Sequence, residues 1–282
     1  MSGDFPHQAS FRRVLLQEDF DRFARLTGDD NPIHCDPFYA QHTHFGATVS
    51  HGMLLYGLIA KALSELLPGP GVRQLTQELM FPNPTYTGEE IRIELECQDR
   101  APDGALDILT RVSKAEDVIT AEGRTRVLPQ GIPTAPAIER EITGEGASDA
   151  ELYGLRLGKQ AEASRSFNAR DLAEYGDLVG DRNPLFRGAA AEVPGALLAG
   201  MFSDLLGTRL PGRGTGWMKQ RLQFLSPARP GEALLARVEI TRLRAAKELV
   251  NLRTEVFGPG QRLVVDGEAL VLVRNLENRQ AR

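Results

Sequence analysis

The chain has 282 residues and a net charge of −5, with 41% hydrophobic and 25% charged residues. Such a length holds one large domain or two smaller ones, with enough apolar side chains for a sizeable core. The acidic balance argues against nucleic acid or an anionic membrane as a partner. Two cysteines exclude a disulfide framework, and no apolar run is long enough to span a membrane, so we expect a cytoplasmic protein.

The pattern predicts a short strand first and then a helix over residues 17–26. Phe20, Phe23 and Leu26 recur at helical spacing, so one face of this helix turns inward. Gly28 is typical of the residue that follows a helix C-terminus. The helix therefore ends just before a turn, and that turn carries the most informative motif of the chain.

The motif places the carboxylate of Asp29 five residues before the imidazole of His34, with Asn31 and Pro32 between them. A carboxylate and a histidine that converge on one point can hold a water molecule and take its proton. The alternative is a plain helix stop followed by a turn, because Gly, Asp, Asn and Pro are all common turn residues.

A second helix is predicted over residues 52–67, which are apolar nearly all round and therefore buried. It opens with Gly52, and Pro68 ends it. Four segments that alternate between apolar and polar residues follow, which is typical of an antiparallel meander: residues 75–81, 90–98, 106–113 and 118–127. A sheet curled around a central helix satisfies both patterns.

The whole module occurs twice, which indicates a tandem duplication. Seven residues between Pro68 and Gly88 recur in the second half at a constant offset of 143. All five histidines lie in the first 51 residues, and Phe186 replaces His34 in the second copy, so only the first half retains the pair. The repeated turn residues are Gly28, Asp29, Asn31 and Pro32 in the first half and Gly180, Asp181, Asn183 and Pro184 in the second.

We divide the chain into an N-terminal domain of residues 1–129, a linker of residues 130–148 and a C-terminal domain of residues 149–282. The linker is rich in proline, glycine and acidic residues, which is typical of an exposed connection. The second copy is nine residues shorter between its turn motif and its buried helix, so we expect a closed or vestigial second pocket and one active site per chain. Two sheets that join edge to edge would remove an exposed edge from each.

This order of elements, with Gly-Asp-x-Asn-Pro-Ile-His before a buried helix opened by His-Gly, resembles the MaoC-like family of (R)-specific enoyl-CoA hydratases and 3-hydroxyacyl thioester dehydratases. The resemblance implies an α+β double hot-dog fold, in which two antiparallel sheets each wrap a central helix and join as an internal pseudo-dimer. It also implies that Asp29 and His34 are the catalytic acid/base pair and that Gly52 offers its backbone N–H to the thioester carbonyl. Some relatives carry an assisting serine on the central helix, where Ala60 stands here.

The activity that the resemblance implies is that of a hydro-lyase, which hydrates 2-enoyl-CoA and dehydrates (R)-3-hydroxyacyl-CoA. The substrate carries coenzyme A, and we expect neither a further cofactor nor a metal, since no metal-ligand cluster is evident in the sequence. Asn31 and His51 are candidate substrate-binding residues, although His51 fits better as an anchor for the start of the buried helix.

The degenerate C-terminal half is expected to form a wall of the substrate site that holds pantetheine and nucleotide. Four basic residues near the end of its helix could meet the phosphates of CoA, and a solvated basic face is the alternative reading. These residues are Arg209, Arg213, Lys219 and Arg221.

Three other functions stay open: a dehydratase of acyl carrier protein thioesters, a thioesterase, and a non-catalytic acyl-thioester-binding protein. The Asp29/His34 motif argues against the thioesterase, because thioesterases of this fold usually lack it. The expected partner is an acyl-CoA, with acyl carrier protein as the alternative carrier. Neither nucleic acid nor a membrane is expected, and a homodimer is an option beyond the internal pseudo-dimer. The length and branching of the acyl group cannot be read from the sequence.

Overall fold

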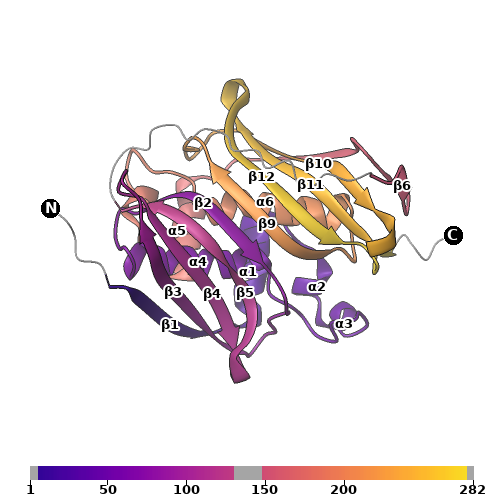
Figure 1. Cartoon of the computed structure of the whole chain (residues 1–282), viewed down its shortest axis with the longest axis horizontal. Coiled ribbons are helices and arrows are strands. Elements are labelled where there is room, and N and C mark those ends of the chain that lie inside the picture. Colours follow the sequence, from indigo (N-terminus) through magenta and orange to yellow (C-terminus); the bar gives the residue numbers. More distant parts are fainter. Residues whose placement is uncertain (1–5, 130–147, 278–282) are drawn as a thin grey trace.

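The computed structural model describes residues 6–129 and 148–277. Alternating apolar and polar residues form the strands, which are β1 (Gln8–Val14), β2 (Arg73–Met80), β3 (Glu90–Arg100), β4 (Leu106–Lys114), β5 (Val118–Leu128), β8 (Gln160–Arg165), β9 (Gly216–Phe224), β10 (Leu234–Arg244), β11 (Leu249–Gly258) and β12 (Arg262–Leu272). They build one ten-stranded antiparallel sheet in the order β1-β3-β4-β5-β2-β9-β12-β11-β10-β8 (Figure 1). A separate hairpin pairs β6 (Glu151–Leu152) with β7 (Leu155–Arg156).

The two halves of the chain meet where β2 pairs with β9. This antiparallel register runs from Thr76 opposite Gln223 to Met80 opposite Lys219. The pairing confirms the predicted edge-to-edge join, which leaves neither inner strand with an unpaired row of backbone groups.

The helices are α1 (Gln17–Thr27), α2 (Pro32–Cys35), α3 (Pro37–Ala40), α4 (Gly52–Glu65), α5 (Ala169–Val179) and α6 (Gly195–Asp204), and α6 continues as the π-helical turn η3 (Leu205–Arg209). The long helices lie behind the sheet in Figure 1. Short 3-10 turns cover Ala115–Asp117, Pro184–Phe186, Ala245–Lys247 and Pro259–Gln261. Within the described residues, the helices are all too short or too polar to cross a membrane.

The central helix α4 is buried along its length, as its sequence predicts, and Met53, Leu58 and Leu63 are fully enclosed. It ends at Glu65, two residues earlier than predicted. The reason is local, because proline lacks a backbone N–H and disfavours helical backbone angles in the residue before it.

Each central helix packs against the first helix of the other half. A Cβ atom on Gly200 of α6 would lie 2.2 Å from Cγ2 of Thr27 at the end of α1. At the repeat-related position, a Cβ atom on Gly57 of α4 would lie 3.1 Å from Cγ1 of Val179 in α5. Glycine permits these close approaches. Side chains of α6 therefore reach the turn after α1, and those of α4 reach the turn after α5.

The arrangement of sheet and helices confirms the predicted α+β class. The proposed linker, residues 130–148, lies outside the described residues except for its last one. The division into residues 1–129 and 149–282 therefore stays a prediction.

Candidate active site

The end of α1 places Asp29. Gly28 has a left-handed backbone with φ of 83°, and its N–H donates to the Ala24 carbonyl at 2.7 Å, which closes the helix. The chain then turns inward, so Asp29 is only 1% exposed. A buried carboxylate needs polar partners, because burying an unpaired charge is costly.

The one-turn helix α2 brings His34 back towards Asp29. Asn31 caps this helix, since its Oδ1 accepts the N–H of Ile33 at 3.3 Å. Pro32 occupies the first helical position, which suits a residue that has no N–H to satisfy. The Nδ1 atom of His34 lies 2.7 Å from the Val49 carbonyl. A carbonyl only accepts hydrogen bonds, so Nδ1 carries the proton.

Two hydrogen-bond acceptors face each other at this point. Nε2 of His34 lies 3.8 Å from Oδ2 of Asp29. Burial lowers the pKa of His34 below its usual value, and the nearby Asp29 carboxylate opposes this shift only in part. The neutral ring with its proton on Nδ1 leaves Nε2 as an acceptor. A water molecule between the two groups can donate one hydrogen to each.

His51 contacts both residues of this pair. Its ring is fully buried and stacks on the His34 ring with 3.7 Å between centroids. Its Nε2 donates to the backbone carbonyl of Asp29 at 3.1 Å. Burial lowers the pKa of His51 well below its usual value, so the ring is neutral near pH 7. This geometry fixes the backbone of Asp29 and agrees with the anchoring role expected for His51.

A serine that the sequence analysis missed contacts the carboxylate. Oγ of Ser203, on α6 of the other half, donates to Oδ2 of Asp29 at 2.5 Å. Ser203 stands at the repeat position of Ala60, 143 residues later. Ala60 does stand at the serine position of the first half, and the crossed helix packing brings a serine to Asp29 from the other half instead.

Asn31 and Gly52 frame the same site. The side-chain amide of Asn31 donates through Nδ2 to the Gly207 carbonyl of the π-helical turn at 3.1 Å. Both polar atoms of this amide are therefore hydrogen-bonded to the protein backbone, Oδ1 to Ile33 and Nδ2 to Gly207. Gly52 is the first residue of α4, where backbone N–H groups have no partner within the helix. A Cβ atom on Gly52 would lie 2.8 Å from the ring of Phe81, so a larger residue would require this ring to shift.

Comparison with known proteins places the chain in a family. A family model described as a MaoC like domain matches residues 5–118. An (R)-specific enoyl-CoA hydratase of Aeromonas caviae is 39% identical over 126 residues, which make up 42% of this chain and 94% of that protein. The chain belongs to the MaoC-like dehydratase family. The membership confirms the predicted enzyme class, a hydro-lyase.

Two further comparisons extend this result. A 3-hydroxybutyryl-CoA dehydratase of Methylorubrum extorquens is 31% identical over 116 residues, which cover 41% of this chain and 74% of that protein. A Mycobacterium tuberculosis protein with a double hot-dog fold matches with a TM-score of 0.72 at 15% identity, over 95% of this chain and 97% of that one. The predicted double hot-dog fold is thus confirmed for this MaoC-like chain.

The second half of the MaoC-like chain retains the acid of the motif and lacks the histidine. Asp181 is buried, and its Oδ1 accepts a hydrogen bond from Oγ of Ser64 on α4 at 2.6 Å. Phe186 occupies the sequence position of His34 and has no atom that can accept a hydrogen bond from water. Within the described residues, an acid and a histidine of this motif therefore occur together only in the first half.

Two of the four predicted basic residues lie on strand β9. Lys219 and Arg221 alternate with the buried Gln220 along β9, so they project from the face of the sheet that carries no helices. This favours a solvated face for these two residues. Arg209 donates to the Glu162 carbonyl at 2.8 Å, and contacts between CoA phosphates and either Arg209 or Arg213 stay a prediction.

Three side chains of the site could together hold a metal ion. One ligand atom each of Asp29, His34 and His51 lies within 4.8 Å of the other two. However, Nε2 of His51 carries the proton that is donated to the Asp29 carbonyl, and a metal there would have to displace this hydrogen bond. The donor set therefore fits a metal-free site better than a metal centre.

Proposed function

We propose that this chain adds water to 2-enoyl-CoA to give (R)-3-hydroxyacyl-CoA and catalyses the reverse dehydration. The observation that carries the proposal is the 3.8 Å gap between two acceptors, Nε2 of His34 and Oδ2 of Asp29. The names of the related hydratase and dehydratase support the choice of a CoA thioester as substrate.

The proposed reaction starts from a water molecule that donates a hydrogen to Asp29 and a hydrogen to His34. Both lone pairs of the water oxygen then point away from the pair, towards the substrate. The oxygen forms a bond to the β-carbon, Asp29 takes the proton released by the water, and the electrons of the double bond move towards the thioester oxygen. The proton then passes to the α-carbon on the same face, so that the elements of water are added in full.

The negative charge that develops on the thioester oxygen needs a donor. The Gly52 N–H, at the positive end of the α4 dipole, is the group we assign to this role. Asn31 is bonded to Ile33 and Gly207, which supports a positioning role for it rather than direct contact with substrate. In this proposal His51 likewise positions Asp29 and His34.

The test is a spectrophotometric panel of 2-enoyl-CoAs of different length and branching, followed by chiral analysis of the product. We expect the enone absorbance to disappear and an (R)-3-hydroxyacyl-CoA to form. Parallel assays with acyl carrier protein thioesters identify the carrier. Release of a free thiol without loss of the enone would instead indicate a thioesterase, and binding without either change would indicate a non-catalytic protein.

Replacing Ser203 with alanine removes the hydroxyl that holds Oδ2 of Asp29. A hydrogen bond to a charged group is worth about 1.5–3 kcal/mol, so we predict a decrease in kcat of about 10- to 100-fold. Ser203 acts through Asp29 and not on the substrate, so KM for crotonyl-CoA is expected to change little. Steady-state kinetics separate the two parameters, and a change in KM alone would contradict this role.

Removing metal ions is predicted to leave activity unchanged, because the proposed reaction uses only Asp29, His34 and a backbone N–H. The measurement is crotonyl-CoA hydration before and after dialysis against EDTA. A loss that added Zn²⁺ or Mg²⁺ restores would show that Asp29, His34 and His51 hold a metal after all.

A further inference from the structure

A single side chain links the two segments that orient His34. Gln17 is the first residue of α1 and is partly buried. Its Nε2 donates to the backbone carbonyl of His34 at 2.8 Å, and its Oε1 accepts a hydrogen bond from Oγ1 of Thr48 at 2.6 Å. Nε2 also donates to Oδ1 of Asp21, one turn along the helix, at 2.9 Å. The amide of Gln17 therefore ties α1 both to α2 and to the segment that precedes α4.

Thr48 lies next to the group that accepts the hydrogen bond of the His34 ring. The Val49 carbonyl accepts from Nδ1 of His34 at 2.7 Å, and the Val49 N–H donates to the Ile33 carbonyl at 3.1 Å. Thr48 is only 2% exposed, so its hydroxyl needs a partner within the protein, and Gln17 is that partner. Gln17 thus holds the backbone of His34 and the neighbour of Val49 at the same time.

The bond from the His34 ring depends on how these two segments are placed. The proton of a neutral imidazole stays on the nitrogen that has an acceptor, and the other nitrogen is then free to accept. If the segments move apart, the bond from Nδ1 to the Val49 carbonyl weakens and the proton can move to Nε2. Nε2 would then be a donor, and it could no longer accept a hydrogen bond from the water that we place between His34 and Asp29.

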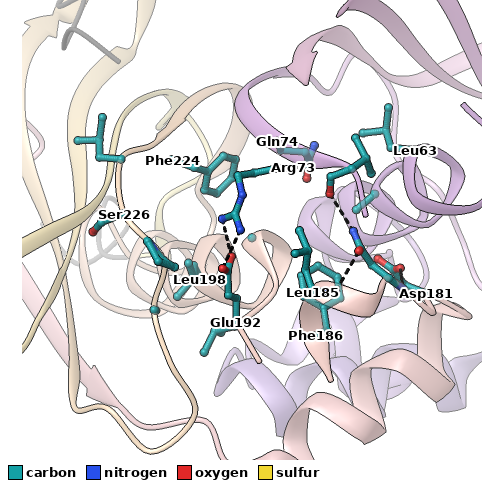
Figure 2. A pocket seen from close by; sticks show the side chains of 18 residues that line it. Leu63, Arg73, Gln74, Asp181, Leu185, Phe186, Glu192, Leu198, Phe224 and Ser226 are labelled. Atoms are coloured by element: carbon teal, nitrogen blue, oxygen red, sulfur yellow. Dashed lines mark hydrogen bonds and ion pairs between the residues drawn. The ribbon is translucent and has the colours of Figure 1, made fainter. Parts of the chain in front are cut away.

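The second half keeps the backbone of this turn. The Glu192 N–H donates to the Leu185 carbonyl at 2.8 Å, just as the Val49 N–H donates to the Ile33 carbonyl. Figure 2 shows Leu185, Phe186 and Glu192, which line a cavity of about 90 Å³ in this half. This hydrogen bond makes Glu192 the counterpart of Val49, so the residue before Glu192 is the counterpart of Thr48.

Three polar residues around the first turn have apolar counterparts in the second: Gln17, Thr48 and His34 correspond to Ala169, Ala191 and Phe186. Ala169 begins α5 as Gln17 begins α1, and the two helices have the same length of 11 residues. The second turn therefore folds without the amide and without the hydroxyl. Because the turn itself does not require them, their contacts in the first half serve the histidine that occurs only there.

We propose that Gln17 and Thr48 are positioning residues for His34, which keep the proton of its neutral ring on Nδ1 and leave Nε2 as an acceptor. Both act through His34 and not on the substrate. Their effect on the rate of hydration rests on the proposed function, whereas their effect on the ring proton of His34 does not.

The first test is the steady-state hydration of crotonyl-CoA by variants of the two residues. Thr48→Val keeps the shape of the side chain and removes one hydrogen bond, so we expect kcat to fall about 2- to 10-fold with little change in KM. Gln17→Ala also loses the bond to the His34 carbonyl and should lower kcat about 10-fold. The double variant should be little slower than Gln17→Ala, because the shared bond is already absent.

Two further variants serve as controls. Thr48→Ser keeps the hydroxyl and should retain the kcat of the wild type. Glu18→Ala changes an exposed neighbour of Gln17 on the same helix and should leave kcat and KM unchanged. Circular dichroism and thermal unfolding report whether each variant folds.

The second test observes the ring proton directly. Nitrogen-15 NMR distinguishes a protonated ring nitrogen from a bare one, and the His34 signals are those that disappear in His34→Ala. At about pH 8, where the buried ring is neutral, we expect the wild type to carry the proton on Nδ1. In Gln17→Ala and Thr48→Val we expect a measurable share of His34 to carry it on Nε2.

The outcomes separate this inference from the proposed function. A lower unfolding temperature with an unchanged kcat would show that Gln17 and Thr48 only stabilise the fold, and the proposal would be wrong. It would also be wrong if kcat fell while the His34 proton stayed on Nδ1 in both variants. A wild-type chain that hydrates none of the enoyl-CoAs would overturn the proposed function alone, since a shift of the ring proton in the variants would still confirm the positioning of His34.

Discussion

Replacing Asp29 with asparagine is expected to lower kcat for crotonyl-CoA hydration by about 10²–10⁴-fold. The amide keeps the size of the side chain and can still accept from Ser203 through its oxygen. It cannot take a proton from water, so the chemical step is lost while the fold is preserved. Steady-state kinetics and a thermal unfolding curve of the variant check both parts of this expectation.

The matched control is Asp30→Asn, which removes the same charge one residue later on an exposed side chain. We expect its kcat to stay close to that of the wild type. If Asp29→Asn retained full turnover, the carboxylate would not be the base, and the proposed reaction would have to be abandoned. If both variants lost activity equally, the effect would come from the charge of the turn and not from Asp29 itself.

The parts of the structure that local sequence determines could be predicted. Gly28 predicts the end of α1, and the apolar run that begins at Gly52 predicts a buried helix. The constant offset between the two halves identifies the duplication, and with it the need to pair two open sheet edges. The helix signals lie in short stretches of chain and the duplication in a comparison of the two halves, so a single sequence contains them all.

The contact between Ser203 and Asp29 could not be predicted in the same way. These residues are 174 positions apart, and they meet because α6 packs over the end of α1 through Gly200. Within the first half, the position of the assisting serine is occupied by Ala60, so the sequence of that half alone does not reveal Ser203. The repeat did contain a clue, since Ser203 is the repeat equivalent of Ala60. To use this clue, one has to know that the central helix of each half contacts the turn motif of the other half.

The second half was expected to hold a closed or vestigial pocket, and the structure excludes a closed one. The shorter loop of the second half suggested that a pocket wall is missing and that the space collapses. In the structure the missing residues correspond to a cover, α3 and the loop after it, and their loss opens a groove that reaches Asp181. Whether a deletion removes a wall or a lid depends on the packing around it, which a single sequence does not contain.

The second large loss of activity is expected on replacing His34. The protonation of His34 is also expected to determine how activity depends on pH. The proposed reaction needs Nε2 of His34 as an acceptor, so the ring must be neutral. Burial lowers the pKa of His34 below 6.5, its ordinary value. The wild-type kcat/KM is therefore expected to stay level from about pH 8 down to about pH 6.5, and to fall below that range as the ring takes up a proton. A decline that begins above pH 7 would contradict this assignment, since it would require a raised pKa.

Replacing His34 with alanine should lower kcat by about 10²–10⁴-fold, because the water loses one of its two acceptors. The residual activity should also lose the decline just below pH 6.5. His51 cannot take over that decline, because burial lowers its pKa much further than that of His34. His42→Ala is the matched control: it removes an exposed imidazole and should leave both the rate and the pH profile as they are. If the decline in kcat/KM persists in His34→Ala, another group titrates in that pH range. The decline would then not report protonation of His34 at Nε2, and this assignment would be wrong.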